Sequence, residues 1–337
     1  MPKDIIVVGA SAGGIEALRV LVSGLPDDLP AAIFVVLHTS PESPGMLAEI
    51  LARVGTLPAV NAQDGARIEH GRIYVAPPDR HLLIEPRVLR VTRGPKENRF
   101  RPAVDPLFRS AAQTYGPRVI GVILTGYLDD GTAGLWTIKQ LGGTTIVQDP
   151  DEALVPFMPQ NALAHVKVDY CLLLEEIAPL LVRLTTEEAE EEGEFQVPKE
   201  VEIEVNIAKE QKALDAGVLR LGEPSNYACP ECHGVLLQLK EGGLLRFRCH
   251  TGHAYSIESL LADITEQMDD ALWNSIRAFE EGELFMRHMA EHLGKAENGH
   301  TAEAFLKRAD EAQRRGDLLR QVVINNEKPN AGDADKW

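Results

Sequence analysis

The first 184 residues alternate continuous apolar runs with segments of helical periodicity, and this alternation limits the fold more than any other feature. The runs IIVV at 5–8, AIFVVL at 32–37 and VIGVIL at 119–124 lack the polar positions that a strand with one solvated face carries. Strands that are buried on both faces and separated by helices form a parallel sheet. We therefore predict an α/β fold, with a three-layer α/β/α, doubly wound and mostly parallel sheet.

Two further features add to this pattern. Leu82–Glu85 and Val88–Thr92 are short runs joined by two residues, which predicts an antiparallel hairpin added at one edge of the sheet. Beyond the sheet region, a small segment rich in cysteine and histidine precedes long stretches in which apolar residues recur every four positions. We predict a helical hairpin in this C-terminal region.

Charge is distributed unevenly along the chain. The net charge of −17 divides into 17 basic and 20 acidic residues over 1–184, and 17 basic and 31 acidic residues over 185–337. Such an acidic chain repels phosphate backbones, so we expect no nucleic acid partner. No apolar run reaches the length of about 18 residues that a membrane span needs, and the first residues enter a strand without a signal pattern. We expect no membrane insertion and a cytoplasmic location.

The composition changes at the segment Thr185–Glu204. It holds nine glutamates against one lysine, with Gly193 and Pro198 among them. It carries too little apolar surface to fold alone, and its like charges repel one another. We therefore predict an acidic linker over residues 185–226.

A serine lies in a tight turn of small residues at the end of the first predicted strand. The stretch GASAGG at 9–14 places Ser11 where the strand becomes a helix, and the unpaired N–H groups of a helix start can stabilise an oxyanion. Three alternatives stay open. A dinucleotide-binding turn needs glycine at the position of Ser11, the nucleophile elbow of α/β-hydrolases follows several strands rather than the first, and a plain strand–helix turn has no chemistry.

Two more reactive side chains follow predicted strands of the same sheet. His38 comes directly after the apolar run at 32–37, and Asp130 lies just beyond the run at 119–124. In a doubly wound sheet the carboxyl ends of the parallel strands meet at one edge, where ligands bind. Ser11, His38 and Asp130 can therefore converge as nucleophile, general base and then acid, and orienting carboxylate.

Several motifs occur in a fixed order over roughly residues 3–184. They are GASAGG at 9–14, VVLH at 35–38, VAPPDRHLLIE at 75–85, RPAVDPLFRSAA at 101–112, VILTG at 122–126, DGTAG at 130–134 and MPQNA at 158–162. Together they resemble the catalytic domain of the CheB-type chemotaxis protein-glutamate methylesterases. The fold that this resemblance implies is the three-layer α/β/α sheet with a hairpin.

The resemblance also implies a function. The family's catalytic serine, histidine and aspartate fall on Ser11, His38 and Asp130, with an oxyanion contact from the backbone around Tyr127. The implied substrates are methyl esters of glutamate on the cytoplasmic helices of chemoreceptors, with deamidation of glutamine at equivalent sites as a second activity. The resemblance implies no cofactor for catalysis.

The chain departs from the family pattern in two places. The family's glycine-methionine-glycine stretch appears here as Gly126-Tyr127-Leu128 followed by an additional acid, and this leaves Asp129 as an alternative partner of His38. Family members with regulated activity often begin with a phosphorylatable receiver domain, whereas this chain starts at the catalytic strand. We expect control to be absent, supplied by a receiver protein in trans, or exerted by the C-terminal part.

Three of the four cysteines lie in a segment with the spacing of metal ligands. A C-x₂-C pair is followed, after sixteen residues, by a C-x₃-H pair. Four such ligands predict a closed, structural zinc site, since a catalytic zinc keeps one position open. His250 and His233 are alternates for the fourth ligand, and free thiols or a redox pair are the alternatives to a metal. The predicted ligands are Cys229, Cys232, Cys249 and His253.

The predicted organisation has five parts, and two rival functions stay open. A catalytically idle scaffold of a chemosensory-like system would bind its partner without turnover, and a serine esterase would use the same three residues on another substrate. The predicted parts are a methylesterase catalytic domain at 1–184, an acidic linker at 185–226, a zinc-binding module at 227–256, a helical hairpin at 257–326 and a disordered tail at 327–337.

Overall fold

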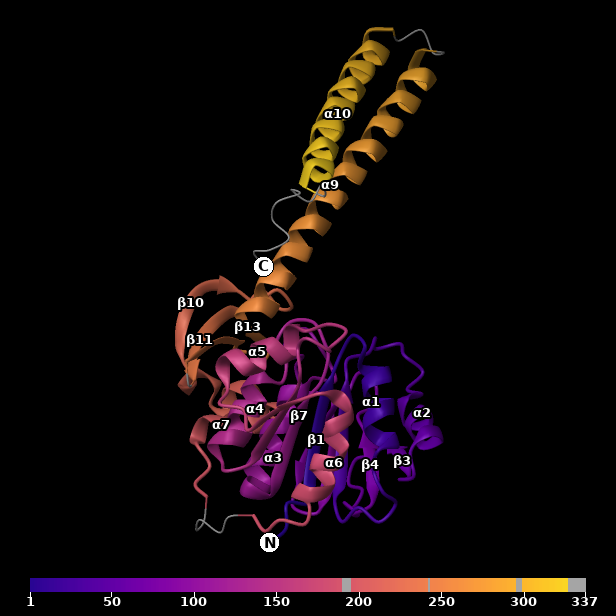
Figure 1. Ribbon diagram of the computed structural model, residues 1–337. Coiled ribbons are helices and arrows are strands. Elements are labelled where there is room, and N and C mark those ends of the chain that lie inside the picture. Colours follow the sequence, from indigo (N-terminus) through magenta and orange to yellow (C-terminus); the bar gives the residue numbers. More distant parts are fainter. Residues whose placement is uncertain (190–194, 242, 295–298, 327–337) are drawn as a thin grey trace. The chain divides into compact units, whose positions relative to one another are not determined.

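A computed structural model describes residues 1–189, 195–241, 243–294 and 299–326 of the chain (Figure 1). The chain divides into two compact units, Met1–Leu260 and Leu261–Trp337, and each is described here by itself. The predicted disordered tail at 327–337 lies outside the described residues.

The first unit is built on a seven-stranded sheet in the order β3-β4-β2-β1-β7-β8-β9. Every neighbouring pair in it is parallel, and Val8 in the central strand is paired with Val35 on one side and Val122 on the other. The prediction of a mostly parallel sheet is confirmed. The strands are β1 (Ile5–Ala10), β2 (Ala32–Leu37), β3 (Ala59–Asn61), β4 (Arg72–Val75), β7 (Val119–Ile123), β8 (Thr144–Gln148) and β9 (Tyr170–Leu172).

Helices cover both faces of this sheet, which gives the three layers that the sequence predicts (Figure 1). Ile6 and Val8 of β1 face a core shared with α1, α2 and α6, whereas Ile5 and Val7 face a core shared with α3, α4 and α5. Because both faces are buried, the strand has no polar position. The helices are α1 (Gly14–Ser23), α2 (Leu47–Val54), α3 (Val104–Tyr115), α4 (Thr132–Gln140), α5 (Phe157–His165) and α6 (Leu174–Leu184), with a 3-10 turn at Gly116–Arg118.

The predicted hairpin forms, but its predicted place at the sheet edge is wrong. β5 (His81–Glu85) and β6 (Val88–Thr92) are antiparallel and make a separate two-stranded sheet. Leu82 and Leu89 belong to the same core as Phe108 of α3. The hairpin therefore buries its apolar face against the helix layer, and this contact replaces pairing with an edge strand.

The prediction of an acidic linker is wrong where the structure describes it. Residues 199–208 form helix α7, whose Ile203 and Ile207 pack against Leu237 and Leu239 of a second sheet. The acidic composition shows only that the segment cannot fold alone, whereas α7 buries its apolar side against strands that come later in the chain. The remaining elements of this part are α8 (Ala213–Ala216), a 3-10 turn at Val218–Arg220, and the antiparallel strands β10 (Glu223–Ala228), β11 (Val235–Glu241), β12 (Leu244–Cys249) and β13 (Ala254–Ser256).

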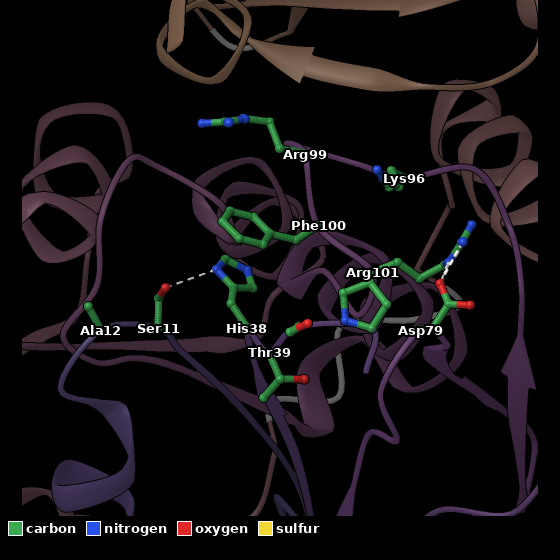
Figure 2. A pocket seen from close by; sticks show the side chains of 11 residues that line it. Ser11, Ala12, His38, Thr39, Asp79, Lys96, Arg99, Phe100 and Arg101 are labelled. Atoms are coloured by element: carbon green, nitrogen blue, oxygen red, sulfur yellow. Dashed lines mark hydrogen bonds and ion pairs between the residues drawn. The ribbon is translucent and has the colours of Figure 1, made fainter. Parts of the chain in front are cut away.

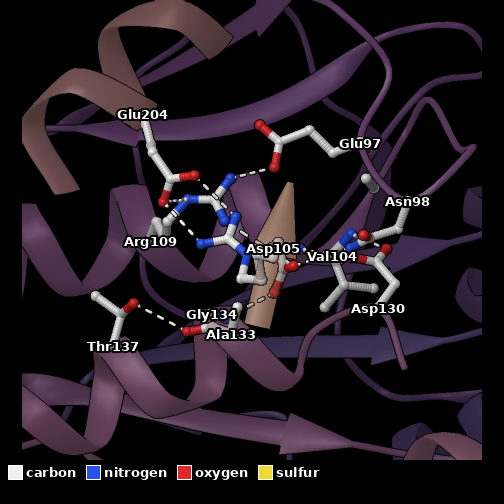
Figure 3. A network of polar contacts seen from close by, with 12 residues as sticks. Glu97, Asn98, Val104, Asp105, Arg109, Asp130, Ala133, Gly134, Thr137 and Glu204 are labelled. Atoms are coloured by element: carbon white, nitrogen blue, oxygen red, sulfur yellow. Dashed lines mark hydrogen bonds and ion pairs between the residues drawn. The ribbon is translucent and has the colours of Figure 1, made fainter. Parts of the chain in front are cut away.

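A buried carboxylate on α7 is surrounded by arginines from other elements. Glu204 accepts from Arg246 at 2.8 Å and from Arg248 at 2.7 Å. Arg109 of α3 lies 3.6 Å from the second oxygen of Glu204, and Figure 3 shows Glu204 and Arg109 close together. Burial alone would raise the pKa of Glu204, but the three guanidinium groups outweigh it and hold that pKa well below its ordinary value. This cluster ties α7 and β12 to the α/β part, so the predicted boundaries at 184 and 226 both lie within one compact unit.

We predict that Glu204→Gln lowers the free energy of unfolding by about 3–5 kcal/mol at neutral pH, because it removes the carboxylate that pairs with all three buried arginines and leaves Glu97 to balance Arg109 and Arg248. A depressed pKa stabilises the fold above the ordinary glutamate pKa of about 4.3, and this contribution is lost as the pH falls below that value. The difference between wild type and variant in urea unfolding should therefore narrow toward pH 3. Glu202→Gln, at an exposed position of the same helix, is the control and should change stability little. Equal stability of the two variants would contradict this account.

The described residues of the second unit, 261–294 and 299–326, are helical, so the predicted helical C-terminal region is confirmed. Helix α9 (Ile257–Gly294) begins in the first unit and continues through the second, and α10 (Gly299–Asn326) lies beside it (Figure 1). Arg287 of α9 donates to Asp310 of α10 at 3.0 Å. Among the described residues, no helix has both the length and the apolar character that crossing a membrane requires.

Candidate active site

The chain leaves β1 at Ser11 and turns sharply into α1. Gly13 adopts φ of 76°, a left-handed conformation that glycine takes without strain, and the N–H of Gly14 donates to the carbonyl of Ser11 at 2.9 Å. Gly126, after β7, approaches the serine so closely that a Cβ there would lie 2.7 Å from the Cβ of Ser11. The small residues of both turns thus leave the Ser11 hydroxyl accessible.

The structure brings the three predicted catalytic residues together. Ser11, His38 and Asp130 follow β1, β2 and β7, which are neighbours in the sheet. The Oγ of Ser11 lies 3.1 Å from His38 Nδ1, and Nε2 of the same ring lies 2.7 Å from Asp130 Oδ2 (Figure 2 shows the first of these contacts). The side chains of His38 and Asp130 are almost fully buried.

The contacts of His38 determine which ring nitrogen can act as a base. An ionised carboxylate only accepts hydrogen bonds, so Nε2 carries the proton and donates it to Asp130. Nδ1 is then unprotonated and accepts from the Ser11 hydroxyl. The two nitrogens have exchanged the roles that they hold in the chymotrypsin-type arrangement, in which the serine faces Nε2.

Asp130 is held as an anion by four donors. Besides His38, its oxygens accept from the N–H groups of Val104 at 2.6 Å and Asp105 at 3.2 Å, which are the first residues of α3, and from the amide of Asn98 at 2.9 Å. Burial alone would raise the pKa of Asp130, but these hydrogen bonds outweigh it and lower that pKa below its ordinary value. Burial, with Asp130 nearby, raises the pKa of Asp105 to about 7.

The alternative that Asp129 orients His38 is not what the structure shows. The carboxylate of Asp129 accepts from the hydroxyl of Ser256 and is buried, and burial raises its pKa well above the ordinary value. Asp130 makes the contact with His38 instead. The side chain of Tyr127, whose backbone the resemblance places at the oxyanion, is exposed and stacks on Phe157.

A pocket of about 550 Å³ opens over this serine–histidine pair (Figure 2). Phe100 forms one wall and stacks flat on the His38 ring, with 3.7 Å between ring centroids. Arg101 also lines the pocket and pairs with Asp79 at 2.6 Å. The pocket is lined by Ser11, Ala12, His38, Thr39, Ser40, Pro41, Asp79, Lys96, Arg99, Phe100 and Arg101.

Sequence reasoning missed two residues at this site. Phe100 and Asn98 lie in the loop between β6 and α3, and neither was a candidate. Phe100 immediately precedes the RPAVDP motif, which could have drawn attention to it. Asn98 carries no such signal, because an asparagine in a charged loop is ordinary turn chemistry.

The cysteine module, residues 227–256, brings its predicted ligands together. Cys229 and Cys232 lie in the turn after β10, and Cys249 ends β12. The ligand atoms of these cysteines and of His253 all lie within 4.8 Å of one another, so they could hold a metal ion. The alternates His250 and His233 are not members of this group.

The fold and the site together define a class of protein. Three adjacent parallel strands deliver a serine, a histidine and a carboxylate to one edge of an α/β sheet, in hydrogen-bonded order. This is the arrangement that serine-dependent hydrolases use on several unrelated folds.

Comparisons with known proteins identify the family. A family model described as CheB methylesterase matches residues 6–181. A putative protein-glutamate methylesterase/protein-glutamine glutaminase of Leptospira interrogans is 40% identical over 185 residues, which are 55% of this chain and 96% of the relative. The protein-glutamate methylesterase/protein-glutamine glutaminase 2 of Anaeromyxobacter dehalogenans is 41% identical over 182 residues, 54% of this chain and 53% of its own. The Thermotoga maritima CheB methylesterase catalytic domain superposes with a TM-score of 0.53 at 36% identity, covering 54% of this chain and 98% of that one. The chain belongs to the CheB methylesterase family.

Proposed function

We propose that this chain hydrolyses methyl esters of glutamate side chains on the cytoplasmic helices of chemoreceptors. Ser11 is the nucleophile, His38 the general base and then acid, and Asp130 the orienting carboxylate. The observation that carries the proposal is the hydrogen-bonded chain through these three side chains at the pocket. The names of the relatives support the substrate class. The reaction takes place in the cytoplasm and uses no cofactor.

Acylation begins when His38 Nδ1 takes the proton of the Ser11 hydroxyl while Oγ attacks the ester carbonyl carbon. The carbonyl π electrons move to oxygen, and the tetrahedral intermediate then collapses and breaks the bond to methoxide. Methoxide takes the proton from Nδ1 and leaves as methanol. Asp130 stays ionised throughout and stabilises the imidazolium that exists between these two transfers.

The negative charge of the intermediate needs donors near Ser11. Ala12 directly follows the nucleophile, in the turn that precedes α1, and Tyr127 follows Gly126, which approaches Ser11 closely. Neither N–H has a hydrogen-bond acceptor within the ranges that the structure describes. We propose these two groups as the oxyanion donors, which are worth most when they are fixed before the reaction.

Deacylation reuses the same groups. Water attacks the glutamyl ester of Ser11 and gives its proton to His38, which then protonates the serine as it leaves. The products are a free glutamate side chain and the original enzyme. Glutamine forms the same acyl intermediate by releasing ammonia, so deamidation is a second activity of the site. It is slower because the amide nitrogen is a poorer leaving group than the ester oxygen.

Release of methanol from a methylated receptor fragment tests the proposal. We expect the wild-type chain to release methanol well above the uncatalysed rate. No release, with no labelling of Ser11 by a fluorophosphonate, would favour an idle scaffold. Labelling of Ser11 without any activity on the receptor would favour a serine esterase with another substrate.

We further propose that the metal of the cysteine module is structural zinc. Zinc–sulfur and zinc–nitrogen bonds of about 2.3 and 2.1 Å in a tetrahedron place ligand atoms about 3.6–3.8 Å apart. The Sγ atoms of Cys232 and Cys249 are 3.6 Å apart, and His253 Nδ1 lies 3.6 Å from the Sγ of both Cys229 and Cys249. Four protein ligands close the coordination sphere and leave no position for a substrate.

This zinc proposal predicts about one zinc per chain in the purified protein by elemental analysis. His253→Ala should lose that zinc, because it removes one of four ligands. His250→Ala is the matched control, since it changes the alternate histidine three residues earlier, and should keep it. If His250→Ala lost its zinc and His253→Ala kept it, His250 would be the fourth ligand in place of His253. A wild-type chain without zinc would overturn the proposal.

A further inference from the structure

The loop between β6 and α3 contacts the cysteine module on one side and the active site on the other. Residues 96–98 of this loop pair with β13: the N–H of Asn98 donates to the carbonyl of Ala254 at 2.8 Å, and the N–H of Ala254 donates to that of Lys96 at 3.2 Å. Two residues further on, Phe100 stacks on the ring of His38. A short stretch of chain thus spans the distance between the module and the catalytic histidine.

The side chain of Asn98 makes this connection through hydrogen bonds at both ends of its amide. Its Nδ2 donates to Asp130 Oδ1 and to Asp105 Oδ2, each at 2.9 Å (Figure 3). Its Oδ1 accepts from the backbone N–H of Ser256 at 3.0 Å and from Ser259 Oγ at 3.3 Å. The two carboxylates accept hydrogen bonds, so the N–H₂ group of Asn98 must face them. The N–H of Ser256 donates, so the amide oxygen must face it, and the amide of Asn98 has one orientation only.

Glu97 and Asp129, the sequence neighbours of Asn98 and Asp130, also make contacts between the module and the α/β part, but they do not contact His38. Glu97 pairs with Arg248 of β12 at 3.0 Å and with Arg109 of α3. Asp129 accepts from the hydroxyl of Ser256 at 2.6 Å. These contacts attach the module to the α/β part, whereas the amide of Asn98 extends the attachment to the carboxylate that holds the catalytic ring.

We propose that Asn98 is a positioning residue of the esterase, through which the end of the cysteine module and the start of α9 fix the Asp130 carboxylate. This rests on the proposed function, because it assigns Asp130 its orienting role. Asn98 does not line the pocket, so it touches no substrate. The module then helps to position the catalytic residues. It fixes the orientation of the Asn98 amide, which fixes the Asp130 carboxylate, and this carboxylate fixes the ring of His38.

The test measures two rates on purified full-length variants: methanol release from a methylated receptor fragment, and labelling of Ser11 by a fluorophosphonate. Asn98→Ala should lower kcat and the labelling rate by about 10- to 100-fold, the effect of losing one hydrogen bond to a charged group. KM should stay close to the wild-type value. Asn98→Asp keeps the shape of the side chain, and aspartate tolerates the left-handed φ of 49° at this position. It places a third carboxylate against Asp130 and Asp105, so both of its rates should be no higher than those of Asn98→Ala.

A matched control separates this role from mere attachment of the module. Lys209→Gln breaks the 2.8 Å ion pair between α7, which packs on the strands of the module, and Glu85 of β5, and neither residue lines the pocket. It should keep kcat and the labelling rate. A folded Asn98→Ala that matches wild type in both rates, or a control that falls as far, would overturn the inference.

A second variant tests the connection from the side of α9. Ser259→Ala removes one donor to Asn98 Oδ1 and should slow labelling by about 2- to 10-fold. Combined with Asn98→Ala, it should add nothing, because both changes act through one amide. Additive losses would overturn the inference, and if Asn98→Ala does not fold, an unchanged rate in Ser259→Ala does so alone. Labelling of Ser11 without methanol release would remove the proposed substrate, while the labelling rates would still decide the role of Asn98.

Discussion

Replacing Ser11 by alanine should lower the rate of methanol release from a methylated receptor fragment by about 10⁴- to 10⁶-fold. Without the hydroxyl, no acyl-enzyme forms, and His38 can only assist direct attack by water. The groups proposed to stabilise the oxyanion remain, which leaves some residual catalysis. A rate assay at saturating substrate, with methanol quantified directly, measures the loss.

The control for this change is Ser23→Ala at the other end of α1. Its exposed hydroxyl donates to the carbonyl of Val20 and does not line the pocket, so the rate of Ser23→Ala should match that of wild type. Both variants should unfold at the wild-type temperature. A Ser11→Ala protein that keeps a substantial part of the wild-type rate would show that the serine is not the nucleophile.

Replacing Asp130 by asparagine should lower kcat by about 10⁴-fold at neutral pH, the effect that the same change has in well-studied serine proteases. Each carboxylate oxygen of Asp130 accepts two hydrogen bonds. Whichever oxygen the N–H₂ group of asparagine replaces, this group therefore faces two hydrogen-bond donors that it cannot accept from. If the N–H₂ group faces Nε2 of His38, it favours the tautomer in which Nε2 is unprotonated and Nδ1 carries the proton. A protonated Nδ1 cannot accept the hydrogen bond of the Ser11 hydroxyl. Steady-state rates with the receptor fragment measure the loss.

Asp129→Asn is the matched control, one residue earlier in the same loop. An asparagine there can still accept from the hydroxyl of Ser256, and Asp129 does not touch His38. Its loss of activity should be far smaller than that of Asp130→Asn. If the two variants lost activity equally, the assignment of the orienting carboxylate to Asp130 would be wrong.

The sheet and the convergence of the catalytic candidates could be predicted because both depend on local pattern. Apolar runs identify strands, and the carboxyl ends of parallel strands share one edge, so Ser11, His38 and Asp130 had to lie near one another. The spacing of the cysteines in the same way predicted a group of side chains that lie together and could hold a metal ion. Neither inference needed to know how distant parts of the chain pack.

The parts that could not be predicted depend on contacts between distant residues. The acidic helix α7 is buried because arginines about forty residues later neutralise Glu204. Asn98 matters because Ser256, 158 residues later, fixes its amide. Which nitrogen of His38 faces the serine follows from the orientation of one ring, which no spacing encodes.

The most direct test of the account is to follow the inactivation of the wild-type chain by a fluorophosphonate, with mass spectrometry to locate the adduct. The account predicts a single adduct on Ser11, and methanol release from the methylated receptor fragment that falls in proportion to the labelled fraction. Full methanol release by protein that is completely labelled at Ser11, or inactivation through an adduct elsewhere, would contradict it.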